Sequence, residues 1–197
     1  ERSARYLRQT ETYMRELTEK RLLEDVSKEI RYLQQICGDF SIINDQVTQL
    51  LQIREASSAF SKATADDLKL CGEAVRETLD IVAEGFETRS GQLADTVREF
   101  REVVSGLFHQ INIRQINRIH SGESGSETGT PFTETCFAYE LIMDRCDRIA
   151  GNLLACDSLS PVVSRDQQDP AAREKRHQQI RSLFRDKFSL LNQNDGE

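Results

Sequence analysis

The sequence predicts an all-α protein, built as an up-and-down bundle of long helices. Apolar residues recur at spacings of three and four along most of the chain, which is the periodicity of an amphipathic helix. Helix breakers are scarce, with only three Pro in 197 residues. Hydrophobic residues make up 38% and charged residues 30%, so the core must come from apolar stripes along helices.

The first helix is expected from about Ala4 to Thr18, and a second helix follows a short break near Lys20. Along the second helix the apolar spacing alternates between four and three, which is typical of a helix–helix seam. The inner face expected for this helix is made of Val26, Ile30, Leu33, Cys37, Phe40, Asn44, Val47 and Leu51, widened by Ile36, Ile43 and Leu50.

Residues 54–64 are expected to be a linker, after which Thr64 and Asp67 have the spacing of a capping box for the third helix. The fourth helix is the longest, from about Leu93 to His120. The inner stripe of the third helix comprises Leu68, Cys71, Val75, Leu79, Val82 and Phe86. The stripe of the fourth comprises Leu93, Val97, Phe100, Val104, Leu107 and Ile111, and its next positions bring Arg114 and Arg118.

The segment "SGESGSETGTP" is rich in Gly and Ser and is expected to be a flexible loop. A fifth helix follows from about Pro131 to Cys156, and a last, amphipathic helix from about Ala171 to Leu191. The inward residues expected in the fifth helix are Phe137, Leu141, Ile142, Cys146, Ile149 and Leu153. The last helix is locally basic, so it packs on the bundle or, as the less favoured alternative, lies on an anionic membrane surface.

Charge and composition exclude several classes of protein. A net charge of −7 argues against a chain that wraps a nucleic-acid backbone. No apolar run approaches the roughly 20 residues that span a bilayer. The five cysteines are odd in number and none forms a CxxC pair, so buried reduced thiols are expected rather than zinc ligands or disulfides.

Two arginines, Arg114 and Arg118, lie one turn apart near the end of the fourth helix, and Arg145 on the fifth helix could converge with them. One hypothesis is an anion-binding fork, because guanidinium groups bind phosphate oxygens in pairs. The favoured hypothesis is that they cap the helix and pair with carboxylates. The candidate partners are Glu134, Glu140 and Asp144.

Three segments together resemble the PhoU-like family. The first helix has the pattern E-x5-L-x5-Y-x3-L at Glu1, Leu7, Tyr13 and Leu17. The fourth helix ends in "RQINRIHSGES", which is similar to the family's R-H-I-x-R-L-x-x-G ending. The fifth helix holds "LIMDRCDRIAGNL", in which Asp144 and Arg145 match the family's Glu-Arg and Asn152 matches its Asn. The resemblance covers roughly residues 1–158, although each motif is short.

The resemblance implies tandem three-helix bundles of PhoU type. Residues 1–53 would be the last two helices of a first bundle that is incomplete at its N-terminus, and 65–158 the complete second bundle. Residues 159–197 would be a linker and the C-terminal helix. The resemblance further implies a non-enzymatic regulatory domain of a sodium-dependent phosphate cotransporter, on the cytoplasmic side of the bacterial inner membrane. Its partner would be the transporter's own upstream transmembrane domain, or a second copy of the chain.

The family's metal sites use E-x-x-x-D pairs, and the matching positions of this chain have largely lost them. In the second bundle the pairs fall on Arg101 with Ser105 and on Asp144 with Arg148. We therefore expect no metal and no cofactor, and interpret Asp144 as an ion-pair partner of Arg101 or Arg148. The corresponding pairs of the first bundle fall on Glu1 with Arg5 and on Gln34 with Gly38.

The remaining alternatives belong to other classes of protein. The chain could be a free-standing PhoU-type adaptor that senses metal or phosphate, or a helical scaffold unrelated to the family. Enzymatic activity is not expected, because His109, His120 and His177 are scattered and no catalytic constellation follows from helical spacing. Because the chain opens inside a helix, a longer protein is expected.

Overall fold

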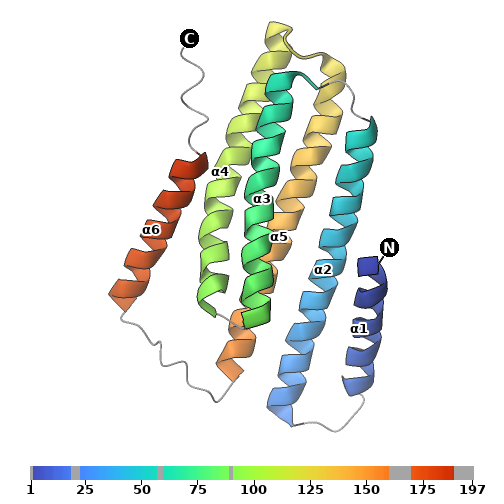
Figure 1. The fold of residues 1–197 in the computed structure, drawn as a ribbon, viewed down its shortest axis with the longest axis vertical. Coiled ribbons are helices and arrows are strands. Elements are labelled where there is room, and N and C mark those ends of the chain that lie inside the picture. The colour runs from blue at the N-terminus through green and yellow to red at the C-terminus, as the bar shows by residue number, and fades with distance from the viewer. Residues whose placement is uncertain (1, 19–22, 57–59, 89–90, 160–169, 189–197) are drawn as a thin grey trace.

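The computed structural model describes the chain except for residues 1, 19–22, 57–59, 89–90, 160–169 and 189–197 (Figure 1). The described part is all-helical, and long helices that follow one another in the chain run antiparallel (Figure 1). The elements are α1 (Arg2–Thr18), α2 (Glu24–Ala56), α3 (Lys62–Thr88), α4 (Gly91–Ser121), the 3-10 helix η1 (Ser126–Thr128), α5 (Gly129–Leu159) and α6 (Pro170–Phe188). The expectation of an all-α fold is confirmed.

The centre of the structure is a three-helix unit. Helix α3 packs against α4 and α5, and α4 packs against α5. Helix α2 lies on another side of α5, while α1 packs against α2 and α6 against α4 (Figure 1). Ile36 and Ile43 of α2 belong to the same core cluster as the side chains of α3, α4 and α5. The core is therefore continuous across the expected boundary at 54–64, and the division into two bundles stays a prediction.

The stripe predicted for α4 is confirmed where side chains are described. Val97, Phe100, Val104, Leu107 and Ile111 are all buried. The side chain of Leu93 lies outside the described residues. Phe108, next to this stripe, is also buried, so the apolar face of α4 is wider than one strict seam.

The face of α2 that meets the rest of the bundle differs from the prediction. Ile36 and Ile43 are buried, whereas Val26, Val47 and Leu51 are 40%, 42% and 55% exposed. Their assignment to the inner face is wrong, whereas Ile30 and Cys37 of the same predicted face are buried as expected. Val47 lies on the same side of α2 as Ile43, so the periodicity does not show where along this side the burial stops.

Two aromatic residues predicted to face inward are instead exposed: Phe86 at 39% and Phe137 at 61%. Phe86 lies near the end of α3, where its ring makes an edge-on contact with Phe40 of α2, with 6.0 Å between ring centroids. Phe137 has the buried residues Cys136 and Ala138 on either side. Phe137 lies five residues before Ile142, so it points away from the buried stripe of α5 that includes Ile142, Cys146 and Ile149.

Helix α3 begins earlier than predicted, and Thr64 does not cap it. The side chain of Ser61 accepts a hydrogen bond from the Thr64 backbone N–H at 3.2 Å, and the Ser61 carbonyl accepts one from Ala65 N–H at 2.9 Å. Ser61 is thus the capping residue. Thr64 and Asp67 lie inside the helix and are buried, so their side chains are available for contacts with other helices.

The Gly/Ser-rich segment is short and tied to the bundle rather than being a long flexible loop. Gly122 has a φ of +80°, and its N–H donates to the Ile119 carbonyl at 3.2 Å, as at many helix C-termini. The N–H of Ser124 donates to the Arg118 carbonyl at 3.1 Å, and Ser124 and Thr128 are buried. The chain then enters η1 and α5 directly.

Helix α6 is docked on α4, as the packing alternative predicted. Phe184 is buried and its ring stacks on Phe100, with 3.6 Å between centroids. Arg181 pairs with Glu99, and with Glu102 at 3.2 Å. The expected end of this helix at Leu191 lies outside the described residues. Among the described residues, no helix is both long enough and apolar enough to cross a membrane.

Candidate functional site

A buried carboxylate joins the two arginines that end α4. Asp67 of α3 has a side chain that is only 6% exposed, and both arginines point to it. Arg114 Nη1 lies 3.3 Å from Asp67 Oδ1, and Arg118 Nη1 lies 2.7 Å from Asp67 Oδ2. The structure therefore brings Arg114 and Arg118 together on a carboxylate that was not among the candidates Glu134, Glu140 and Asp144.

A buried hydrogen-bond chain lies beside this cluster. The Thr64 hydroxyl donates to Gln115 Oε1 at 2.7 Å, and Gln115 Nε2 donates to the Thr128 hydroxyl at 3.1 Å. The Thr128 hydroxyl in turn donates to the Gly125 carbonyl at 2.7 Å. These bonds tie the start of α3, the end of α4 and the η1 turn to one another, and they satisfy polar groups that are costly to bury unpaired.

Arg145 does not join Arg114 and Arg118. It donates to a different buried carboxylate, Asp39 of α2, with 3.4 Å between Arg145 Nη1 and Asp39 Oδ1. Arg148 Nη1 lies 3.6 Å from the same oxygen. The three-arginine cluster that includes Arg145 is thus split into two ion-pair clusters, one joining α3 to α4 and the other joining α2 to α5.

Three of the four positions of the second bundle that match the family's metal pairs, Arg101, Ser105 and Asp144, line a cleft between α4 and α5. The ion pair expected between Arg101 and Asp144 is present, with 2.5 Å between Nη2 and Oδ1, and Arg101 Nη1 also lies 3.1 Å from Asp147 Oδ2. Arg148 pairs with Asp39 instead of Asp144. The cleft has a volume of about 230 Å³ and is lined by Arg101, Ser105, Phe108, Glu140, Met143 and Asp144.

The charged side chains Arg101 and Asp144 at this cleft form an ion pair with each other. The guanidinium of Arg101 lies among the carboxylates that would otherwise attract a cation, and so neutralises much of their charge. In the described part of the chain, no group of three or more His, Cys, Asp or Glu side chains is placed to hold a metal ion.

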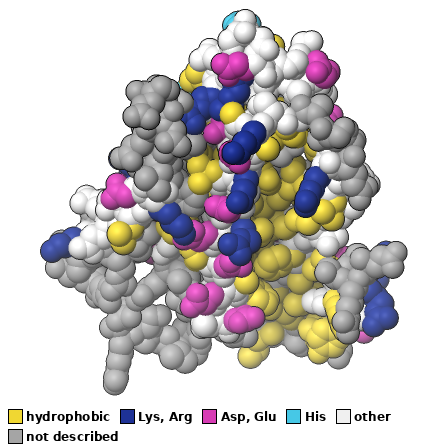
Figure 2. Space-filling view, turned by 45° about the horizontal axis from the view of Figure 1, so that its top comes forward, with side chains coloured by type: hydrophobic (Ala, Val, Ile, Leu, Met, Phe, Trp, Pro, Cys, Tyr) yellow, Lys and Arg dark blue, Asp and Glu magenta, His cyan; other side chains and the backbone are white. Residues whose placement is uncertain are grey.

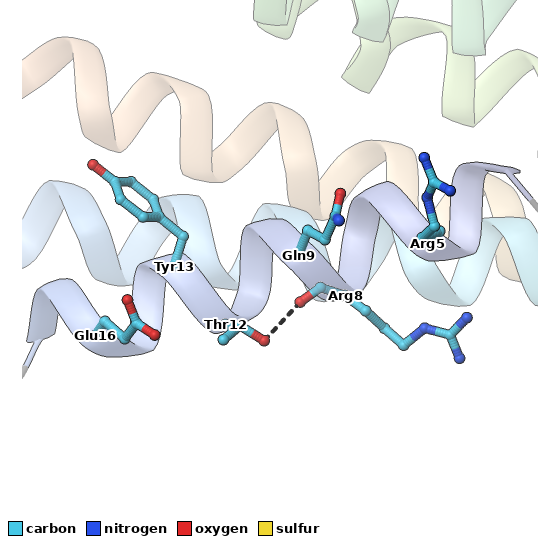
Figure 3. A pocket seen from close by; sticks show the side chains of 6 residues that line it. All are labelled: Arg5, Arg8, Gln9, Thr12, Tyr13 and Glu16. Atoms are coloured by element: carbon cyan, nitrogen blue, oxygen red, sulfur yellow. Dashed lines mark hydrogen bonds between the residues drawn. The ribbon is translucent and has the colours of Figure 1, made fainter.

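A second hollow lies along α1, with a volume of about 390 Å³. Its lining residues, Arg5, Arg8, Gln9, Thr12, Tyr13 and Glu16, all come from one helix. Figure 3 shows that these side chains do not converge: Tyr13, Gln9 and Arg5 point to one side of α1, and Arg8, Thr12 and Glu16 to the other. The only hydrogen bond drawn runs from the Thr12 hydroxyl to the Arg8 carbonyl, so nothing here resembles a built binding site.

Four of the five cysteines are buried, and none of the five is in a disulfide. Burial raises the pKa of Cys136 and of Cys146 to about 12, because a thiolate loses its hydration inside the core. Burial also raises the pKa of Cys71 and Cys37. Cys156 is only half-buried. The four buried thiols are therefore poor nucleophiles near neutral pH.

We expect a thiol reagent such as DTNB at pH 8 to modify Cys156 within minutes and the other four cysteines only as the protein opens. Full modification should need denaturant. Above pH 9 the unfolded thiols ionise while the buried ones stay protonated, so the free energy of unfolding should fall as the pH rises from 9 towards 12. Rapid modification of all five native thiols would contradict this assignment.

The histidines do not form a site in the described part of the chain. His109 and His120 are both exposed on α4 and lie 11 residues apart in the sequence. The side chain of His177 lies outside the described residues.

Sequence analysis missed Asp39 and Asp67 as key residues, although each carries a signal. Each is an acidic residue in register with buried apolar neighbours. Asp39 lies between Ile36 and Ile43, and Asp67 lies one turn before Cys71.

Comparison of the chain with protein-family models, with curated proteins and with solved structures finds no match in any of the three. The resemblance to PhoU-like domains therefore stays a prediction that rests on the residues quoted above.

Proposed function

We propose that this chain is a non-enzymatic interaction module, the PhoU-like regulatory part of a sodium-dependent phosphate cotransporter. The observation that carries the proposal is an exposed apolar surface between α2 and α3. Figure 2 shows a continuous band of hydrophobic side chains there, beside the charged outer face of α3. Val47 and Leu51 of α2 and Phe86 of α3 are large exposed apolar residues of the two helices that border it. We call these three residues the apolar band.

The apolar band suits docking of another helix. A contiguous exposed apolar surface is unusual on a domain that acts alone and often marks an interaction site. Val47 and Leu51 are one turn apart on α2, the spacing with which one helix presents anchors to another. The occupant that we propose is the membrane domain of the same transporter.

The arginine clusters support the same proposal in a different way. Arg101 lies between Asp144 and Asp147, where a metal-binding relative would need unpaired carboxylates. A module held together by internal ion pairs needs no metal for its fold. This favours the transporter domain over a free-standing adaptor that senses metal, and elemental analysis of the purified protein separates the two.

The proposal is tested first by the sequence that precedes Glu1 in the full-length protein, which should contain several apolar segments of about 20 residues each. The second test measures sodium-dependent phosphate uptake by cells that produce the full-length protein. The V47D/L51D variant should change uptake severalfold without unfolding the domain, because both residues are already exposed.

The matched control is I113D/I116D, which places two acids on exposed apolar positions of α4, away from the apolar band. This variant should transport phosphate like the wild type. Unchanged uptake in V47D/L51D, or an upstream sequence without apolar segments, would refute the proposed function.

A further inference from the structure

The described side chains of α6 contact the bundle through one apolar residue and several ion pairs. Phe184 is the one apolar residue of α6 shown to be buried. Ion pairs join Arg181 to Glu99 and Glu102, and Lys187 to Glu77. The acids lie on α3 and α4 and form what we call the acidic strip: Glu77, Glu99 and Glu102.

These contacts are of the kind that water and salt weaken. The side chains of Lys187 and Glu102 are 59% and 62% exposed, and that of Arg181 is 37% exposed. Exposed ion pairs contribute little net stability, and mobile ions screen them further. The buried Phe184 stacked on Phe100 resists this effect, and so in part does the pair of Arg181 with Glu99, whose side chain is 10% exposed. The attachment of α6 should therefore be reversible and sensitive to competing charge.

Most of the described surface of α6 faces water and is basic. Lys175 and Arg185 are exposed and have no ion pair to the acidic strip, and Leu183 is 70% exposed beside the buried Phe184. Over its length the helix has six Lys or Arg against Glu174 and Asp186, in a chain whose net charge is −7. Helix α6 is thus a locally basic segment of an acidic chain.

We propose that α6 is a displaceable arm that exchanges the acidic strip for an anionic lipid surface. In the released state, Arg181 and Lys187 add their charges to those of Lys175 and Arg185, and Leu183 and Phe184 enter the headgroup region. Cations near an anionic leaflet and apolar side chains at its boundary both favour binding, and the acidic strip competes for the same groups. This inference goes beyond the proposed function and does not depend on it.

The test is co-sedimentation with phosphatidylcholine vesicles prepared with and without phosphatidylserine. The E77Q/E99Q/E102Q variant neutralises the acidic strip, so the fraction bound to phosphatidylserine vesicles should rise about tenfold over the wild type. High salt should abolish this binding, and vesicles of phosphatidylcholine alone should bind neither protein.

Two further variants separate release of α6 from a general change in charge. E84Q/E87Q/E134Q removes the same number of negative charges, from exposed acids outside the acidic strip, so its binding should stay within about twofold of the wild type. K175Q/R185Q, made in the E77Q/E99Q/E102Q background, should lower binding about tenfold. The circular dichroism spectrum of each variant should match that of the wild type.

Three results would overturn the proposal: no binding by E77Q/E99Q/E102Q, equal binding to the two vesicle types, or an equal rise in both glutamine triple variants. The last result would show that net charge, and not release of α6, controls binding.

Discussion

Asp67→Ala should destabilise the protein by about 3–5 kcal/mol, because it leaves two arginines facing one another without the buried carboxylate between them. The side chains of Arg114 and Arg118 are only 20% and 14% exposed, so water cannot replace the lost partner fully. For a chain of this size the melting temperature should fall on the order of 10 °C. Differential scanning calorimetry measures this shift.

The control for this prediction is the neighbouring residue Asp66, which is exposed on the same helix. Asp66→Ala removes the same charge one position away and should change stability by less than about 0.5 kcal/mol. If both variants melt at the same temperature, then Asp67 does not hold α3 to α4 through its charge. Asp67→Asn should lie between the two, because the amide can accept one hydrogen bond but carries no charge.

Asp39→Ala should destabilise the contact between α2 and α5 by about 2–4 kcal/mol. The expected loss is smaller than for Asp67, because Arg145 is held at 3.4 Å and Arg148, at 3.6 Å, has a side chain that is 54% exposed. Denaturant unfolding followed by circular dichroism gives the free energy directly.

Asp45→Ala is the matched control, since Asp45 is exposed on the same helix and its loss should be nearly neutral. The double variant Asp39→Ala/Arg145→Ala should be less destabilised than the sum of the single variants, because each single change leaves a charge without its partner. Strict additivity would show that these two side chains are not coupled. Hydrogen exchange should show the loss in α2 and in the facing part of α5.

Much of the fold could be predicted from the spacing of apolar residues alone. The stripe of α4 from Val97 to Ile111 is buried as expected, because a helix with one continuous apolar stripe has one way to bury it. The stripes of α2 were assigned less well. Ile36 and Val47 are eleven residues apart and lie on one side of α2, yet only Ile36 is buried, and periodicity alone does not show where along a stripe burial stops.

Of the ion pairs at the candidate site, one could be predicted from the sequence and another could not. The ion pair of Arg101 with Asp144 could be predicted, since positions expected to face each other on α4 and α5 had opposite charges. The pairing of Arg114 and Arg118 with Asp67 could not, because Asp67 was assigned to the cap of a helix that in fact starts at Lys62. An error of one turn in a helix boundary changed which acid faced inward.

The sequence by itself determined the class of fold, the number of long helices and the presence of arginines at the end of α4, because these depend on residues close together in the chain. Only the tertiary structure decided that Arg145 belongs with Asp39, that Val47 and Leu51 stay exposed, and that α6 lies on an acidic strip. Those outcomes depend on which helix packs beside which, and contacts between distant segments are set by the combined burial of several helices rather than by the periodicity of any one.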